Sequence, residues 1–152
     1  MRTVKLSKLL VNIFIAVGCG VISILLAGGA GDYKILRLPP LAPPSWIFPV
    51  VWTILYILMG TAAYFVSERR GNGRALKIYY IQLALNFLWP IVFFRFDLYW
   101  TAASLAVALA FAVLLTVLEF WQIDILAGKL IVPYFIWLLF AVYLSIGVAV
   151  LN

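Results

Sequence analysis

Long apolar runs separated by short polar segments make up most of the chain. The runs occupy residues 9–27, 46–66, 78–94, 98–120 and 130–151. Each run is close to the ~20 residues that an α-helix needs to cross the hydrocarbon core of a bilayer. The pattern therefore predicts an all-α membrane protein, in which a bundle of five transmembrane helices forms one domain over residues 1–152.

The composition agrees with this pattern. Hydrophobic residues make up 67% of the chain and charged residues 11%, whereas a soluble domain is roughly half apolar and about a quarter charged. An ordinary cytosolic domain is thereby excluded. The first run is longer than the apolar core of a signal peptide, so we expect a retained helix, with cleavage as the alternative.

The positions of the basic residues account for the net charge of +6 without a nucleic-acid partner. In a five-span topology one side of the membrane receives Arg2, Lys5, Lys8, Arg69, Arg70, Arg74, Lys77 and Lys129. The other side receives Lys34, Arg37 and Arg95. Cytoplasmic loops carry the excess of Lys and Arg. We therefore expect the N-terminus in the cytoplasm and the first loop and C-terminus outside. The membrane itself is expected to be a bacterial cell membrane.

The first loop, residues 28–45, is the one long connection. Its prolines, Pro39, Pro40, Pro43 and Pro44, fix the backbone φ angle and remove hydrogen-bond donors, which favours a stiff, extended path. Long loops between tightly joined elements are often functional. Two interpretations remain open, a plain connector and a flap over a site in the bundle.

Residues for acid–base or metal chemistry are scarce. The chain has no histidine, its only cysteine is Cys19, and its five carboxylates fall near the ends of the spans or in loops. Ion-coupled transporters rely on charged groups deep in the membrane, so this class is disfavoured. We expect no metal site and no cofactor.

Aromatic, amide and small residues instead form stripes on three of the expected helices. Helical spacing aligns Trp52, Tyr56 and Gly60 on the second, Gln82, Asn86, Trp89 and Phe93 on the third, and Trp137, Ala141 and Ser145 on the fifth. If these stripes face inward, they line a pocket with flat walls and a few hydrogen-bonding groups. Such a pocket suits a large planar lipophilic molecule.

Each stripe also has a simpler interpretation. Tryptophans anchor helices at membrane interfaces, which is the preferred interpretation for Trp100 and Trp121 and an equal alternative for Trp46. Gln82 and Asn86 can find partners equally well in a ligand or across a helix interface. The fourth run carries Ala102, Ala106 and Ala110, a spacing that permits close packing within the chain or in a dimer.

Three ordered segments carry a resemblance to a known family. They are 38–46 with 52–60, then 82–90 with Phe93 and Phe94, and finally 132–134 with Trp137, Phe140 and Ala141. Together they resemble the TspO/MBR family, the tryptophan-rich sensory proteins. Mitochondrial relatives are called translocator protein or peripheral-type benzodiazepine receptor.

The resemblance implies a five-helix bundle, usually a homodimer, that binds protoporphyrin IX or related tetrapyrroles and isoquinoline carboxamide or benzodiazepine drugs. Its porphyrin would be a ligand or substrate and not a cofactor. With the stripes above, the expected ligand-binding residues are Trp46, Trp52, Tyr56, Gln82, Asn86, Trp89, Trp137 and Ala141. The expected lid residues are Arg37, Pro39, Pro43 and Pro44.

Two alternatives to a receptor or carrier stay open. One is an enzyme that degrades protoporphyrin IX with light and oxygen, in which the resemblance makes Trp52 and Trp137 the catalytic residues. The other is a structural membrane partner without a small ligand, in which the amides and small residues serve packing alone.

Overall fold

The computed structural model describes residues 3–152, which form five long helices and two short helical segments. The long helices are α1 (Leu6–Leu26), α2 (Ile47–Ser67), α3 (Gly73–Pro90), α4 (Tyr99–Ile123) and α5 (Ile125–Leu151). A 3₁₀ segment, η1 (Gly31–Lys34), lies in the first loop, and a π-helical turn, η2 (Ile91–Arg95), continues α3. Five helical spans in the described chain are long and apolar enough to cross a membrane. The all-α membrane bundle expected from the sequence is confirmed.

Two helices begin five residues earlier than the apolar runs indicate. The third begins at Gly73 and not at residue 78, and the fifth begins at Ile125 and not at residue 130. The apolar runs begin after Lys77 and Lys129 because lysine is charged, but the helical backbone includes both residues. Long basic side chains can lie along a helix end while their charges reach water, so an amphipathic first turn is compatible with both positions.

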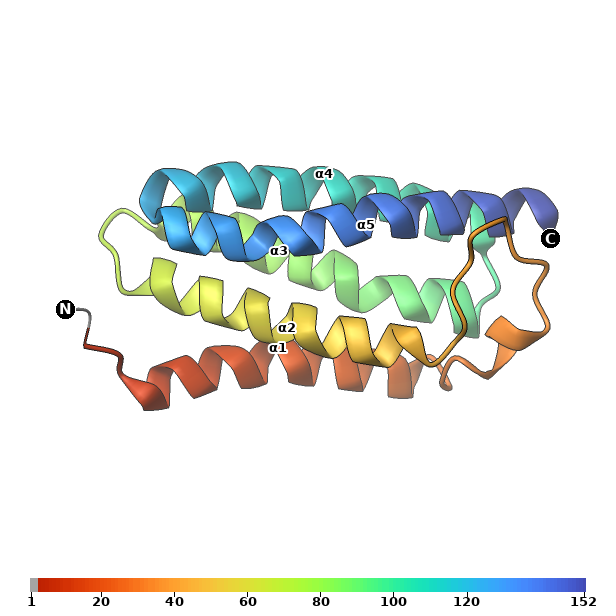
Figure 1. The fold of residues 1–152 in the computed structure, drawn as a ribbon, viewed down its shortest axis with the longest axis horizontal. Helices are drawn as coiled ribbons and strands as arrows, with labels where there is room; N and C mark the ends of the chain where they lie inside the picture. The colour runs from red at the N-terminus through yellow and green to blue at the C-terminus, as the bar shows by residue number, and fades with distance from the viewer. Residues whose placement is uncertain (1–2) are drawn as a thin grey trace.

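All five helices run along the long axis of the bundle, and the two ends of the chain lie at opposite ends of it (Figure 1). The main packed pairs are α4 with α5, α1 with α2, α3 with α4, α2 with α5 and α1 with α3. These pairs close a ring in the order α1, α2, α5, α4, α3. The short connection between α3 and α4 makes them neighbours in this ring, and α2 and α5 lie side by side below the first loop.

Small residues bring several helices close together. Ala102, Ala106 and Ala110 of α4 are buried, and α4 packs most extensively on α5. Of the two roles open for these alanines, packing within the chain is the one seen. A Cβ atom built on Gly60 of α2 would lie 2.5 Å from the backbone Cα of Ile13 in α1. In a bilayer the hydrophobic effect does not drive helices together, because lipid tails are as apolar as the helix side chains. Close approach of helix backbones at small residues provides packing contacts instead.

Proline has different effects in α3 and α5. After Pro90 the α-helical pattern gives way to η2, and the Phe96 N–H donates to the Ile91 carbonyl at 3.3 Å, a bond five residues long. Pro90 has no N–H for the carbonyl four residues earlier, so one helical bond is lost there. In α5 the helix runs without a break through Pro133.

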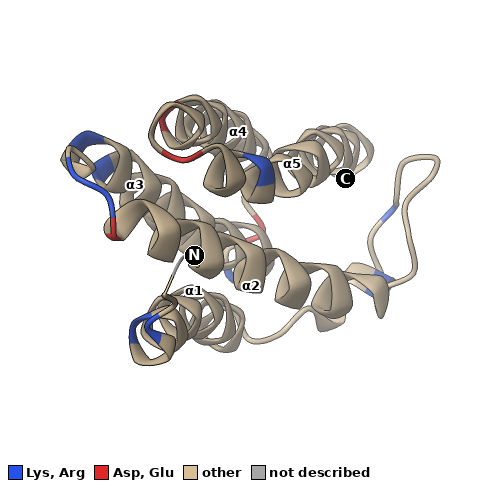
Figure 2. Cartoon of the chain, turned by 60° about the vertical axis from the view of Figure 1, so that its left-hand side comes forward, with Lys and Arg blue, Asp and Glu red and all other residues tan. Residues whose placement is uncertain are grey.

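The charged residues gather at one end of the bundle. Figure 2 shows Lys and Arg at the start of α1, in the α2–α3 connection and at the start of α5, with carboxylates among them. Within residues 3–152, this end carries seven basic residues and three acidic residues, and we call it the basic end. The loop end, with the first loop and the C-terminus, carries three basic and two acidic residues.

Candidate ligand-binding site

Aromatic rings line the contact between α2 and α5 in two groups, beginning directly below the first loop. Tyr33 of η1 contacts Phe48 edge to face at 5.1 Å, and Phe48 contacts Trp137 at 6.1 Å between ring centroids. Deeper in the bundle, Trp52 lies 5.6 Å from Tyr56 and 6.0 Å from Tyr134. Trp52 and Trp137, two tryptophans of the predicted site, pack against the same apolar core, and we call the two groups of rings together the aromatic wall.

A buried hydrogen-bond network closes the inner end of this wall. The Tyr56 hydroxyl donates to Asn86 Oδ1. Asn86 Nδ2 donates to the Tyr134 hydroxyl at 2.8 Å, and that hydroxyl donates to Gln82 Oε1 at 2.9 Å. Gln82 Nε2 lies 3.8 Å from the sulfur of Met59. The network thus joins α2, α3 and α5.

These bonds describe how the two amides are used. Gln82 is fully buried and Asn86 is 3% exposed. Of the two partners that the sequence left open, the structure has both amides bonded across helix interfaces. Buried polar groups in a membrane need such partners, since no water is available to them. Their predicted contact with a ligand stays a prediction.

Two buried side-chain donors on α5 have no hydrogen-bond partner among the described residues. They are the Trp137 indole Nε1 and the Ser145 hydroxyl. The two residues belong to the predicted stripe, with Ala141 midway between them. Eight residues of helix separate them by about 12 Å along the axis. An unpaired buried donor costs about 1–3 kcal/mol, so an acceptor placed at this face of α5 would be stabilised by these two donors.

The remaining predicted residues lie apart from the wall. The Trp89 ring stacks on Phe93 at 4.8 Å, and its Nε1 donates to the Ala102 carbonyl at 3.0 Å. Trp89 thus packs in a second apolar cluster with Leu36 of the first loop. Trp46 is 66% exposed at the start of α2.

Gly60 does not leave an opening in the wall. The backbone of α1 at Asn12 and Ile13 fills the space beside it. The Tyr56 ring in turn packs against Gly20 of α1, where an added Cβ would overlap the ring. The expectation that Gly60 continues the pocket stripe is wrong, because the turn of α2 that carries it faces α1.

The first loop is fastened to the end of α5. Asn152 accepts a bond from the Arg37 N–H at 3.0 Å and donates to the Arg37 carbonyl at 2.8 Å. The Tyr143 hydroxyl donates to the Pro40 carbonyl at 2.7 Å. Pro39 is buried against Gly147, where a Cβ would lie 2.5 Å from its ring. Of the predicted lid residues, Arg37 and Pro39 are thus held on α5.

The base of the loop is held from within. The Tyr33 hydroxyl donates to the Pro43 carbonyl at 2.8 Å, while Pro44 accepts from the Ile47 N–H at the start of α2 at 3.1 Å. The loop therefore lies over the outer end of the aromatic wall in a defined path.

Sequence reasoning missed Tyr33 of the first loop and two members of the wall that lie on α2 and α5. Phe48 precedes Trp52 by four residues, and Tyr134 precedes Trp137 by three, so both lie on or beside stripes that were found. Extending each stripe by one helical turn toward the start of its helix would have included them.

Comparisons with known proteins agree on one family. The TspO/MBR family profile matches residues 10–151. A tryptophan-rich sensory protein of Cereibacter sphaeroides is 42% identical over 120 residues, covering 79% of this chain and 76% of that protein. Protein CrtK of Rhodobacter capsulatus is 36% identical over 144 residues, covering 91% and 89%. The Homo sapiens translocator protein is 34% identical over 137 residues, covering 86% and 80%. This five-helix membrane protein belongs to the TspO/MBR family.

Proposed function

We propose that the protein is a membrane receptor or carrier that binds planar tetrapyrroles such as protoporphyrin IX between α2 and α5, below the first loop. Isoquinoline carboxamide and benzodiazepine drugs would occupy the same place. The observation that carries the proposal is the buried, unpaired Nε1–H of Trp137 within an aromatic wall. An acceptor on a flat ligand would satisfy this donor while the wall contacts the ring.

The chemistry of the wall fits such a ligand. Aromatic side chains offer faces and edges for stacking on an extended ring system. The Ser145 hydroxyl, a second unpaired donor on α5, would meet another polar group of the same molecule. A macrocycle with carboxylate substituents offers acceptors at one edge and at its ring nitrogens, so one molecule could meet both donors.

The rings of the wall contact one another, so in this proposal the wall opens when a ligand binds. Two surface hollows in the structure are lined by residues of the basic end, and neither includes Trp52, Trp137 or the first loop. A ligand that enters between α2 and α5 at this point would displace contacts such as that of Phe48 with Trp137. The first loop is fastened by few side-chain bonds, so lifting it from α5 is the least costly way in.

The test compares Trp137→Phe with Trp100→Phe in purified full-length protein, titrated with protoporphyrin IX and followed by porphyrin absorbance. Trp137→Phe keeps an aromatic ring and removes the donor. A hydrogen bond to a charged group is worth about 1.5–3 kcal/mol, so affinity should fall about tenfold or more. Trp100 is 62% exposed on α4, and its variant should bind as the wild type does. Equal affinity of all three proteins would refute the site.

A second function, degradation of protoporphyrin IX in light and oxygen, is favoured by one feature. Trp52 contacts two oxidisable rings, Tyr56 and Tyr134. Illuminated protein should then form a distinct porphyrin product faster than free-solution bleaching, and Trp52→Phe should slow it. If no such product forms, the enzyme function is refuted and the receptor or carrier function remains.

If no planar ligand raises the Tm in detergent, the alternative of a structural membrane partner without a small ligand is favoured.

We further propose that the basic end faces the cytoplasm and that the protein is a homodimer. The charge difference between the two ends supports the orientation. The dimer rests on the family resemblance alone. Labelling of Lys34→Cys and Lys77→Cys variants from outside intact cells tests the orientation, in a background where Cys19 is replaced by serine. Light scattering of the detergent complex tests the dimer.

A further inference from the structure

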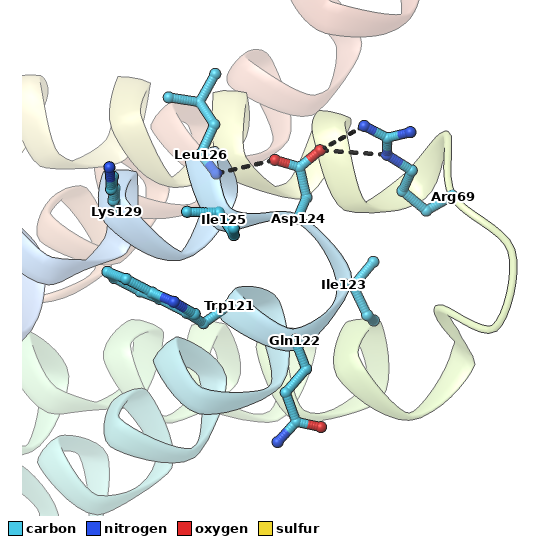
Figure 3. Close-up of a pocket in the computed structure, with 8 residues that line it drawn as sticks. All are labelled: Arg69, Trp121, Gln122, Ile123, Asp124, Ile125, Leu126 and Lys129. Atoms are coloured by element: carbon cyan, nitrogen blue, oxygen red, sulfur yellow. Dashed lines mark hydrogen bonds and ion pairs between the residues drawn. The ribbon is translucent and has the colours of Figure 1, made fainter.

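A polar hollow lies at the basic end, far from the aromatic wall. Its volume is about 580 Å³, and it surrounds the connection between α4 and α5. Figure 3 shows Lys129 and Trp121 on one side of this connection and Arg69 on the other, with Asp124 between them. The hollow is shallow and open on its outer side and is not an enclosed cavity.

The hollow has a rigid frame. Arg69 donates through Nε and Nη2 to Asp124 Oδ2 at 3.2 and 2.9 Å. Asp124 Oδ1 accepts from the N–H groups of Leu126 and Ala127, so it caps the start of α5. The Asp124 side chain is 1% exposed, whereas that of Arg69 is 45% exposed. The Arg69 guanidinium is thereby held in place, and its outer edge still faces water.

Lys129 supplies a second positive charge without a carboxylate partner. The acidic residues of this end are each paired, Glu68 with Lys5 and Lys8, Asp124 with Arg69, and Glu119 with Arg74. Within residues 3–152, no carboxylate lies within ion-pair distance of Lys129. The hollow therefore carries surplus positive charge, which favours an anion.

The rim of the hollow is apolar. Ile125 is 59%, Leu126 45% and Trp121 41% exposed, and all three line the hollow. Tryptophan near a helix end lies at headgroup level. A free anion in water would gain nothing from such a rim, whereas a phospholipid would cover it with the first part of its acyl chains.

We propose that this hollow binds the headgroup of an anionic phospholipid, with Lys129 and Arg69 supplying the positive charge that attracts it and Trp121 and Leu126 against the acyl chains. Basic pockets at the ends of membrane helices are suited to such headgroups. The site shares no residue with the aromatic wall. Failure of either proposal therefore leaves the other unaffected.

The test measures lipid binding to purified full-length protein in a neutral detergent by native mass spectrometry. The probes are phosphatidylglycerol and phosphatidylcholine with the same acyl chains, and inorganic phosphate. We compare the wild type with Lys129→Gln and with Lys77→Gln. Lys77 is the control because it is a basic residue of the same end that lies on α3 and lines no part of the hollow.

The expected result is that phosphatidylglycerol binds in preference to phosphatidylcholine and that Lys129→Gln weakens this binding about fivefold. Lys77→Gln should bind like the wild type. Three results would overturn the proposal: equal binding of the two lipids, equal losses in both variants, or binding of inorganic phosphate as strong as that of phosphatidylglycerol. The last would make the hollow a site for free anions.

Discussion

The Tyr134 hydroxyl of α5 and the side-chain amide of Asn86 in α3 share a hydrogen bond of 2.8 Å in the middle of the bundle. The Tyr134 hydroxyl also donates to Gln82 Oε1, and Asn86 Oδ1 accepts from the Tyr56 hydroxyl. Every member is buried. One phenol thus joins two amides of the same helix, and its ring also contacts Trp52 of the aromatic wall.

Tyr134→Phe should destabilise the protein because it removes the hydroxyl and keeps the ring. Gln82 Oε1 and Asn86 Nδ2 would each lose a buried partner, at about 1–3 kcal/mol per group in water-soluble proteins and about 0.6 kcal/mol per bond in membrane helices. We expect a loss of about 1–3 kcal/mol in all. Thermal unfolding in detergent measures it.

The control for this change is Tyr80→Phe. Tyr80 neighbours Tyr79 on α3, is 44% exposed and makes no hydrogen bond within the described chain through its hydroxyl. Its variant should unfold at the wild-type temperature. If Tyr134→Phe did the same, the network would contribute nothing measurable to stability.

Gly60→Ala should weaken the packing of α1 on α2. The new Cβ would lie 2.5 Å from Ile13 Cα and 2.7 Å from the Asn12 carbonyl oxygen. Both are backbone atoms that cannot rotate away, so the helices must separate, and overpacking of this kind costs about 1–3 kcal/mol. Unfolding in a denaturing detergent titration measures the loss.

Gly18→Ala is the matched control on α1. Nothing lies within 4 Å of a Cβ at this position. Alanine is favoured over glycine within a helix by roughly 0.5–1 kcal/mol, so this variant should be as stable as the wild type or more so. Equal losses in the two variants would mean that the close contact at Gly60 is unimportant.

Gly60 also shows where sequence reasoning reached its limit. Helical spacing correctly aligned it with Trp52 and Tyr56, but a stripe spans several turns and crosses more than one neighbour. Near Trp52 the neighbour is α5, and near Gly60 it is α1. Which neighbour faces each turn depends on crossing geometry, which the spacing of residues along one helix does not contain.

The five spans were predictable for a physical reason. Apolar length is imposed by the bilayer, so it can be read from the sequence one run at a time. Partners of polar side chains are different, because Gln82 and Asn86 had either a ligand or another helix available. The partner that Asn86 takes is Tyr134, which lies 48 residues away along the chain. The residues around Asn86 in the sequence therefore do not indicate it.

Tyr143→Phe should loosen the first loop and speed ligand entry. The change removes the hydrogen bond to the Pro40 carbonyl and keeps the stacking of ring 143 on Phe140. A net hydrogen bond is worth about 0.5–1.5 kcal/mol, so the open loop should become up to about tenfold more populated. Stopped-flow mixing with protoporphyrin IX should show a faster association rate, with Tyr80→Phe unchanged. An unaltered rate would mean that the ligand enters without displacing this contact.

Glu68 gives stability a dependence on pH. Its carboxylate accepts a hydrogen bond from Lys8 Nζ at 2.8 Å and lies 3.6 Å from Lys5 Nζ, so it joins the start of α1 to the end of α2. The Lys8 hydrogen bond, together with the charges of Lys5 and Lys8, lowers the pKa of Glu68 below its ordinary value of 4.5. A lowered folded-state pKa stabilises the protein above the unfolded-state pKa, and this contribution is lost as the pH falls through the folded-state value.

Glu68→Gln should therefore be less stable than the wild type at neutral pH and equally stable in acid. The difference in Tm should narrow progressively as the pH falls below about 4.5, because the wild-type carboxylate becomes protonated and its attraction to the lysines ends. The pair is exposed to solvent, so 1 M salt at neutral pH should also reduce the difference. A Tm difference that stays constant from pH 7 to pH 3 would show that the effect of the substitution is steric and that the charge of Glu68 does not hold α1 to α2.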